Sequence, residues 1–149
     1  MTELLEQSIG EVQQEIVETF GFLEDWTTRY QHIIDIGKEV EGFPEKYQIE
    51  SNKIEGCQSQ VWIVSRMEKG KLYFEATSDS AIVRGLISLL LQVYSGREPK
   101  EILSNPPNFV REIDLSEHLS PTRSNGLASM ISRIMKIAST ELIALHSVE

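Results

Sequence analysis

The sequence contains a single cysteine, Cys57, among its 149 residues. One thiol excludes an internal disulfide and any metal site that is built from several cysteines. It also argues against a thiol–disulfide oxidoreductase, which needs a resolving cysteine, and against an iron–sulfur scaffold, which needs more sulfur ligands. Two kinds of chemistry remain for this thiol: nucleophilic catalysis, or covalent acceptance of a group that is then passed on.

Long apolar runs and an excess of positive charge are also missing. The longest apolar run, LISLLLQVY, is too short to span a bilayer. The first residues carry no basic segment of the kind that begins a secretory signal. We therefore expect a cytoplasmic protein that has no membrane partner. The formal net charge of −9 argues against nucleic-acid binding, because contacts to phosphates need lysine and arginine.

The sequence has no glycine-rich phosphate loop, and its three histidines are scattered without the spacing of metal ligands. We therefore expect no bound cofactor and no metal. No internal repeat, low-complexity tract or linker divides the chain. We expect a single domain over residues 1–149.

The apolar periodicity predicts an α+β fold. Spacings of three and four predict helices over residues 3–20 and 26–40, and β-branched and aromatic residues around Lys69-Gly70 predict a β-hairpin. The segment YQIESNKI predicts a third, weaker strand. Helices are expected in SDSAIVRGLISLLLQVYSG and in SPTRSNGLASMISRIMKIASTELIAL. Asp25 is expected to cap the helix over residues 26–40, and Ser120 the last helix. The result is a small antiparallel sheet of about three strands with helices packed on one face.

Cys57 lies where a loop leads into the first strand of this hairpin. Gly56 permits backbone angles that a side chain forbids, and it lets another molecule approach closely. The polar residues Gln58, Ser59 and Gln60 indicate a partly exposed loop. A buried structural cysteine is the alternative, since free cysteine is among the most buried residue types. The glycine and the polar neighbours favour a functional loop.

A cysteine hydrolase would need a histidine base near Cys57. His32 lies in a predicted helix and His146 in the terminal segment, whereas His118 lies in a loop just before a helix. No cysteine-protease signature surrounds Cys57. An independent cysteine hydrolase is therefore the less favoured interpretation.

Four ordered blocks carry a resemblance to a known family. The segment GCQSQVWI resembles the signature of the SufE family, the sulfur-acceptor proteins of iron–sulfur cluster assembly. Three further blocks are similar to that family in the same order: WTTRYQHIIDIGKEV, then SDSAIVRGLISLLL with SGREPKEIL, then HLSPTRSNGLASMISRI. They cover nearly the whole chain from about Trp26 onward, which makes the resemblance specific. The segment EGFPEKYQIESNKI, before the cysteine, adds nothing to it.

The resemblance implies both a fold and a function. The fold would be a SufE/IscU-like small antiparallel sheet flanked by helices. The function would be that of a sulfur carrier: a pyridoxal-phosphate-dependent cysteine desulfurase (SufS-like) forms a persulfide, Cys57 takes its terminal sulfur and stimulates the desulfurase, and the sulfur goes to an iron–sulfur scaffold complex (SufBCD-like). Such a protein is a sulfur-transfer accessory protein rather than a stand-alone enzyme. A monomer or weak homodimer is expected.

Further residues are candidates for loop or partner contacts, or for tuning the thiolate: Gly56, Gln58, Ser59, Gln60, Asp79, His118 and Arg123. Asp79 or Ser80 is expected to cap the helix after the hairpin, and Asp79 is also placed near the cysteine loop. Arg123 begins a helix, where a cation opposes the helix dipole, so it is a candidate to stabilise a thiolate or persulfide or to dock the desulfurase. His118 is a candidate proton relay, although a loop histidine usually bonds the backbone.

Two other functions stay open at this point. A related branch of the family would serve another desulfurase and feed sulfur to tRNA modification or to cofactor thiolation. The cysteine hydrolase is the other.

Overall fold

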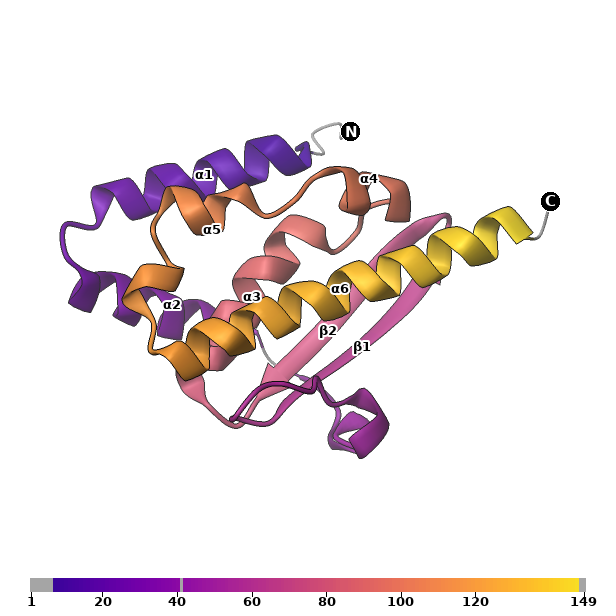
Figure 1. Ribbon diagram of the computed structural model, residues 1–149, viewed down its shortest axis with the longest axis horizontal. Helices are drawn as coiled ribbons and strands as arrows, with labels where there is room; N and C mark the ends of the chain where they lie inside the picture. Colours follow the sequence, from indigo (N-terminus) through magenta and orange to yellow (C-terminus); the bar gives the residue numbers. More distant parts are fainter. Residues whose placement is uncertain (1–6, 41, 148–149) are drawn as a thin grey trace.

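The computed structural model describes residues 7–40 and 42–147. Figure 1 shows a two-stranded sheet covered by one central helix, and helices from both ends of the chain pack around that helix. In chain order the elements are α1 (Ile9–Phe22), α2 (Trp26–Glu39), the 3₁₀ turns η2 (Glu45–Tyr47) and η3 (Glu50–Asn52), β1 (Val61–Glu68), β2 (Lys71–Ser78), α3 (Ala81–Tyr94), α4 (Pro99–Ser104), α5 (Asn108–Glu112), the 3₁₀ turn η4 (Ser116–His118) and α6 (Pro121–Ser147).

The first two helices begin at residues whose side chains cap them. The Ser8 side chain accepts a hydrogen bond from the Glu11 backbone N–H, and the Glu11 side chain accepts one from the Ser8 N–H, so the two form a capping box before α1. The Asp25 side chain caps α2 through the Thr28 N–H, as the sequence predicts. The part of the first predicted helix over residues 3–6 lies outside the described residues.

The predicted hairpin is confirmed. Its strands pair in an antiparallel register that runs from Val61 opposite Ser78 to Glu68 opposite Lys71. Lys69 and Gly70 form the connecting turn with φ values of 53° and 81°, the left-handed pair that matches the twist of a two-residue hairpin.

The predicted third strand is wrong. The segment YQIESNKI forms parts of two 3₁₀ turns, and its only pairing within the described part of the chain is an isolated bridge from Lys53 to Trp62. The Asn52 side chain donates a hydrogen bond to the Tyr47 carbonyl at 2.8 Å. Local side chain-to-backbone bonds of this kind compete with the ladder of a strand.

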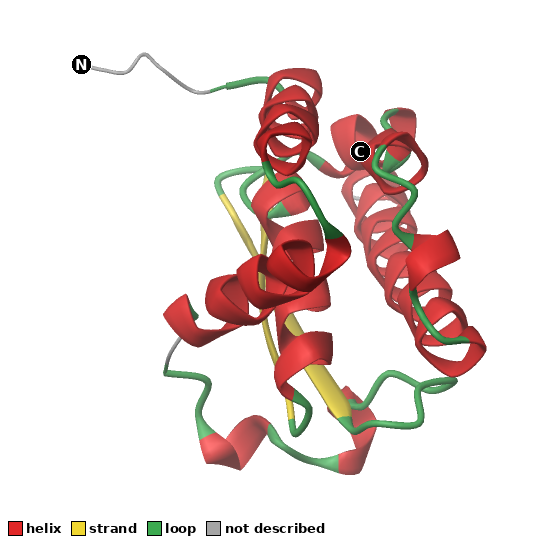
Figure 2. Ribbon diagram, turned by 90° about the vertical axis from the view of Figure 1, so that its left-hand side faces the viewer, coloured by secondary structure: helices red, strands yellow, loops and turns green. Residues whose placement is uncertain are grey.

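The core lies between the sheet and α3. Alternate residues of β2 (Leu72, Phe74 and Ala76) are buried, and most of α3 is buried with them. Figure 2 shows α6 on the far side of α3 from α2, with the loop before β1 reaching the beginning of α6. The predicted α+β class is therefore confirmed, with two strands instead of three.

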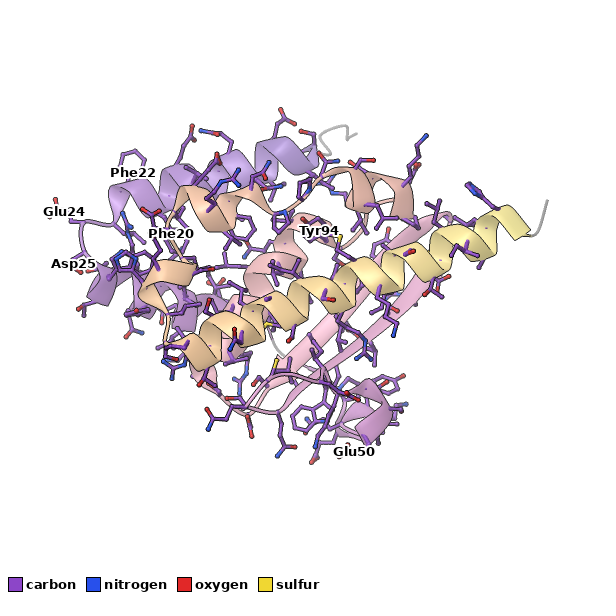
Figure 3. The ribbon with its side chains drawn as sticks, in the orientation of Figure 1. Phe20, Phe22, Glu24, Asp25, Glu50 and Tyr94 are labelled. Atoms are coloured by element: carbon purple, nitrogen blue, oxygen red, sulfur yellow. The ribbon has the colours of Figure 1, made fainter. Side chains whose placement is uncertain are left out.

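The side chains separate interior from surface. Figure 3 shows Tyr94 in the interior, whereas Phe22 and Glu50 extend from the surface. Burial raises the pKa of the Tyr94 hydroxyl well above its usual range, and this hydroxyl donates to the Asn105 carbonyl at 2.7 Å. Among the described residues, no helix is both long and apolar enough to cross a membrane.

Candidate functional site

Cys57 lies in a short loop, residues 55–59, that is held at both ends. On the N-terminal side the Ile54 backbone N–H donates to the Val61 carbonyl at 2.8 Å, which ties the chain to the start of β1. Within the described chain, the only side-chain hydrogen bond made by the loop itself comes from the Cys57 thiol. The loop therefore has firm ends and a weakly held middle.

The other end of the loop is held by the residues that link the sheet to α3. The Gln60 backbone N–H donates to the Asp79 carboxylate at 3.0 Å. The Gln60 carbonyl accepts from the Ser78 hydroxyl at 2.7 Å and from the Asp79 N–H at 3.2 Å. Gln60 is thus the C-terminal anchor of the loop.

The Cys57 side chain is half-buried against α6. Its thiol donates to the Gly126 carbonyl with a sulfur-to-oxygen distance of 3.6 Å. Burial raises the pKa of Cys57 above its ordinary value, because removal from water disfavours the thiolate. In this conformation the thiol ionises less readily than an exposed cysteine.

A pocket of about 290 Å³ opens beside the thiol. The cysteine loop, the first turn of α3 and the first turns of α6 together form its walls. Its lining residues are Cys57, Gln58, Ser59, Val83, Ser120, Thr122, Arg123, Gly126 and Met130. The structure therefore brings four of the sequence candidates together here: Cys57, Gln58, Ser59 and Arg123.

Gly56 passes very close to α6. Its φ of +91° lies in the left-handed region, and a Cβ at this position would lie 2.3 Å from Ser129 Oγ. Both the backbone angle and the close approach make a side chain unfavourable here.

Asp79 does not cap the helix that follows it. Ser80 is the N-cap of α3, with its side chain accepting from the Val83 N–H at 3.4 Å. The exposed Asp79 carboxylate holds Gln60 instead. The expected cap by Asp79 is therefore wrong, whereas the cap by Ser80 and the proximity of Asp79 to the loop are both found.

Arg123 lies in the first turn of α6, on the rim of the pocket. Ser120 caps this helix, because its hydroxyl accepts from the Arg123 backbone N–H at 3.3 Å. The exposed Arg123 side chain makes no hydrogen bond or ion pair with any described residue. Its guanidinium is available to an anion at the mouth of the pocket.

His118 lies outside the pocket lining. Its ring stacks on Trp26 with centroids 4.1 Å apart, and its Nδ1 lies 3.0 Å from the Asp114 carbonyl. These contacts fix the η4 turn before α6. No histidine lines the Cys57 pocket in the part of the chain that the structure describes, so the geometry offers no base for a cysteine hydrolase.

Three residues of α6 that receive the loop were not expected from the sequence: Gly126 as the acceptor of the thiol, Ser129 and Met130. They contact a segment much earlier in the chain: Cys57 and Gly126 are separated by 69 positions in the sequence. Periodicity within one helix does not report such a contact.

Comparison with known proteins shows the family of this chain. A family model described as SufE, Fe-S metabolism associated domain, matches residues 14–138, which include the cysteine loop and the start of α6. The chain belongs to the SufE family. An uncharacterized SufE-like protein of Rhizobium meliloti is 41% identical over 135 residues, covering 87% of this chain and 96% of that protein.

More distant relatives share the same region. The SufE-like protein 1 of Arabidopsis thaliana, described as chloroplastic/mitochondrial, is 36% identical over 126 residues, which cover 84% of this chain and 34% of that protein. The solution structure of a hypothetical protein from Thermus thermophilus superposes with a TM-score of 0.72 at 22% identity, over 89% of this chain and 96% of that one. That similarity shows that the two proteins share a fold.

Proposed function

We propose that this SufE-family protein carries sulfur as a persulfide on Cys57. A pyridoxal-phosphate-dependent cysteine desulfurase (SufS-like) supplies the sulfur, and the protein stimulates its turnover. An iron–sulfur scaffold complex (SufBCD-like) receives it. The observation that carries the proposal is the placement of the lone thiol in a loop that lies against a pocket, without a second cysteine or a histidine base beside it.

The transfer needs no external oxidant. The Cys57 thiolate attacks the terminal sulfur of the desulfurase persulfide, and a new S–S bond forms on Cys57. The old S–S bond breaks, and its electron pair stays on the desulfurase cysteine, which leaves as a thiolate. The proton that Cys57 loses balances the one that the leaving cysteine takes up. The sulfane sulfur keeps its oxidation state throughout.

The absence of a second cysteine suits this chemistry. An internal thiol would attack the Cys57 persulfide and release sulfide before delivery. Every later step therefore takes place on a partner protein. The free Arg123 side chain at the pocket rim supplies a positive charge for the persulfide anion or for docking the desulfurase.

The resting geometry implies that the loop moves during transfer. Burial raises the pKa of Cys57, so the docked thiol is a poor nucleophile. Because residues 55–59 are anchored mainly at Ile54 and Gln60, the middle of the loop can leave the pocket while the sheet stays intact. An exposed thiol then ionises more readily and reaches a partner's cleft.

The cellular setting stays a prediction. We expect the transfer to take place in the cytoplasm, with the protein acting as a monomer or weak homodimer.

Intact-mass analysis tests the proposal. The protein is incubated with a cysteine desulfurase, pyridoxal phosphate and cysteine, and its mass is measured before and after reduction. We expect a gain of one or more sulfur atoms that reductant removes, together with faster alanine production by the desulfurase. Both effects should be lost in Cys57→Ser. A serine variant that still gains sulfur would contradict the proposal.

A further inference from the structure

Arg133, in the middle of α6, reaches across to the segment that precedes the cysteine loop. Its Nη1 donates to the Lys53 carbonyl at 2.8 Å, and its Nη2 lies 3.4 Å from the Ser51 carbonyl. The planar guanidinium can bond two acceptors at once, and hydrogen bonds from a charged donor are stronger than neutral ones. Arg133 therefore holds two backbone carbonyls of the η3 turn, which are 80 and 82 positions away in the sequence.

Arg133 is one of three residues on α6 that receive this segment. Gly126, Ser129 and Arg133 follow one another at spacings of three and four, so they lie on one face of the helix. Gly126 meets Cys57, and Ser129 meets Gly56. Since Arg133 meets the residues before these, the segment 51–57 runs antiparallel along this face.

The three contacts differ in strength. The thiol-to-carbonyl bond at Gly126 is a weak one, with sulfur as the donor. Gly56 lies close to Ser129, and no hydrogen bond joins these two residues within the described chain. Only Arg133 brings a charge-assisted hydrogen bond to the segment.

The position of the segment makes this contact important. Figures 1 and 3 show the 3₁₀ turns, marked by Glu50, projecting from the body below the sheet. Arg133 joins the last residues of these turns, Ser51 and Lys53, to α6. Arg133 also lines a groove of about 480 Å³ with Tyr47 and Asn52, so there is open space beside the two hydrogen bonds.

We propose that Arg133 is a positioning residue that holds the segment 51–57 against α6 and so limits how often Cys57 leaves its pocket. The significance of this role for sulfur transfer rests on the function proposed above. The role itself concerns the conformation of the free protein and can be measured without any desulfurase. Release of Arg133 loosens the N-terminal arm of the loop, and Gly56 and Cys57 then separate from Ser129 and Gly126.

The rate of Cys57 alkylation in the free protein reports how often the thiol is exposed. Arg133→Met keeps an apolar stem of similar length but removes both hydrogen bonds. We expect it to raise the alkylation rate about tenfold, the factor that corresponds to about 1.4 kcal/mol. Lys136→Met removes an exposed cation one turn further along the same helix and is the matched control. It should leave the rate unchanged.

The conservative variant Arg133→Lys covers the case in which Arg133→Met does not fold. Lysine keeps the charge but cannot bond two carbonyls in the plane of a guanidinium. We expect a smaller increase in alkylation of about two- to threefold, the effect of losing the weaker bond. An unchanged alkylation rate in a folded Arg133→Met protein overturns the proposal, as does an unchanged rate in Arg133→Lys if Arg133→Met is unfolded.

The pH profile of alkylation separates positioning from electrostatics. If Arg133 positions the loop, its loss exposes the thiol, and the apparent pKa of Cys57 falls toward the ordinary value. If Arg133 acted as a nearby charge that favours the thiolate, its loss would raise that pKa, and this outcome overturns the proposal. Arg123, the arginine that lines the pocket, is present in the wild-type protein and in the Arg133 variants, so it does not contribute to the difference between them.

The two proposals fail in different ways. If alkylation speeds up in Arg133→Met but Cys57 never accepts sulfur from a desulfurase, the carrier function is wrong and the positioning role stands. If Cys57 accepts sulfur but alkylation is insensitive to Arg133, the positioning role is wrong and the carrier function stands.

Discussion

Gly56 and Gly70 lie at opposite ends of the first strand and share a left-handed backbone, with φ values of 91° and 81°. Their surroundings differ. A Cβ on Gly70 would meet nothing within 4 Å, whereas a Cβ on Gly56 would lie 2.3 Å from Ser129 Oγ. Gly70 serves the hairpin turn alone. Gly56 serves a turn and, in addition, the close contact that seats the cysteine loop on α6.

The difference shows how the site is made. The hairpin turn is formed by adjacent residues and needs no other part of the chain. The cysteine loop is completed by a helix that comes much later in the sequence. The placement of the Cys57 thiol therefore depends on a contact between distant segments, and variants at the two glycines should separate these roles.

Gly56→Ala is expected to have the largest effect. The left-handed backbone costs an alanine about 1–2 kcal/mol, which by itself increases the exposed population of the loop about 5- to 30-fold. The contact with Ser129 adds to this cost. The alkylation rate of Cys57 should rise accordingly. The double variant Gly56→Ala/Ser129→Gly should recover part of the increase, and a complete lack of recovery would show that the contact has no role.

Gly70→Ala should affect stability without affecting the thiol. The same backbone cost of about 1–2 kcal/mol falls on the free energy of unfolding, measured by urea denaturation. Cys57 alkylation should match the wild-type rate, because the turn lies at the other end of the hairpin. Alkylation as fast as in Gly56→Ala would mean that the two turns are not independent.

The pH dependence of the thiol should follow its burial. Burial raises the pKa of Cys57 in the docked loop above that of an exposed thiol. Below the pKa of the exposed thiol, the protonated thiol contributes its full free energy to docking. This contribution is lost as the pH rises through the pKa of the docked thiol. The midpoint of the alkylation profile should lie above that of a peptide with the sequence of residues 54–66. A midpoint at or below the peptide's would mean that Cys57 is exposed at rest.

Arg123→Ala should have the smallest effect on the folded protein. The side chain is exposed, so the change in unfolding free energy should stay within about 0.5 kcal/mol. Transfer of sulfur from the desulfurase to Cys57 should nevertheless slow. Wild-type transfer by Arg123→Ala would remove Arg123 from the site.

Local features of the fold were predictable from the sequence. The turn at Lys69-Gly70 and the caps at Asp25 and Ser120 depend on neighbouring residues, and the structure has them as expected. The prediction of a third strand was wrong because a strand forms only where a partner strand pairs with it in a defined register. In this segment a hydrogen bond from the Asn52 side chain to the Tyr47 carbonyl joins the two 3₁₀ turns and takes the place of that pairing.

The site was predictable only in part, for a similar reason. Cys57, its polar neighbours and Arg123 are conspicuous because of their residue types and their family blocks. Gly126, Ser129 and Arg133 were not found, since a glycine, a serine and an arginine on a helix carry no sign of the loop that they will contact. The sequence also did not decide whether Asp79 or Ser80 caps α3, because both residue types cap helices well.

Locating the transferred sulfur tests the central claim most directly. The protein is loaded by a cysteine desulfurase, its free thiols and persulfides are blocked with an alkylating reagent, and it is cleaved after lysine and arginine. The peptide of residues 54–66, which follows Lys53 and ends at Arg66, contains the only cysteine. We predict that this peptide carries one additional sulfur between Cys57 and the blocking group, and that omitting cysteine from the reaction abolishes it. A peptide recovered without added sulfur, while the desulfurase is turning over, would contradict the account.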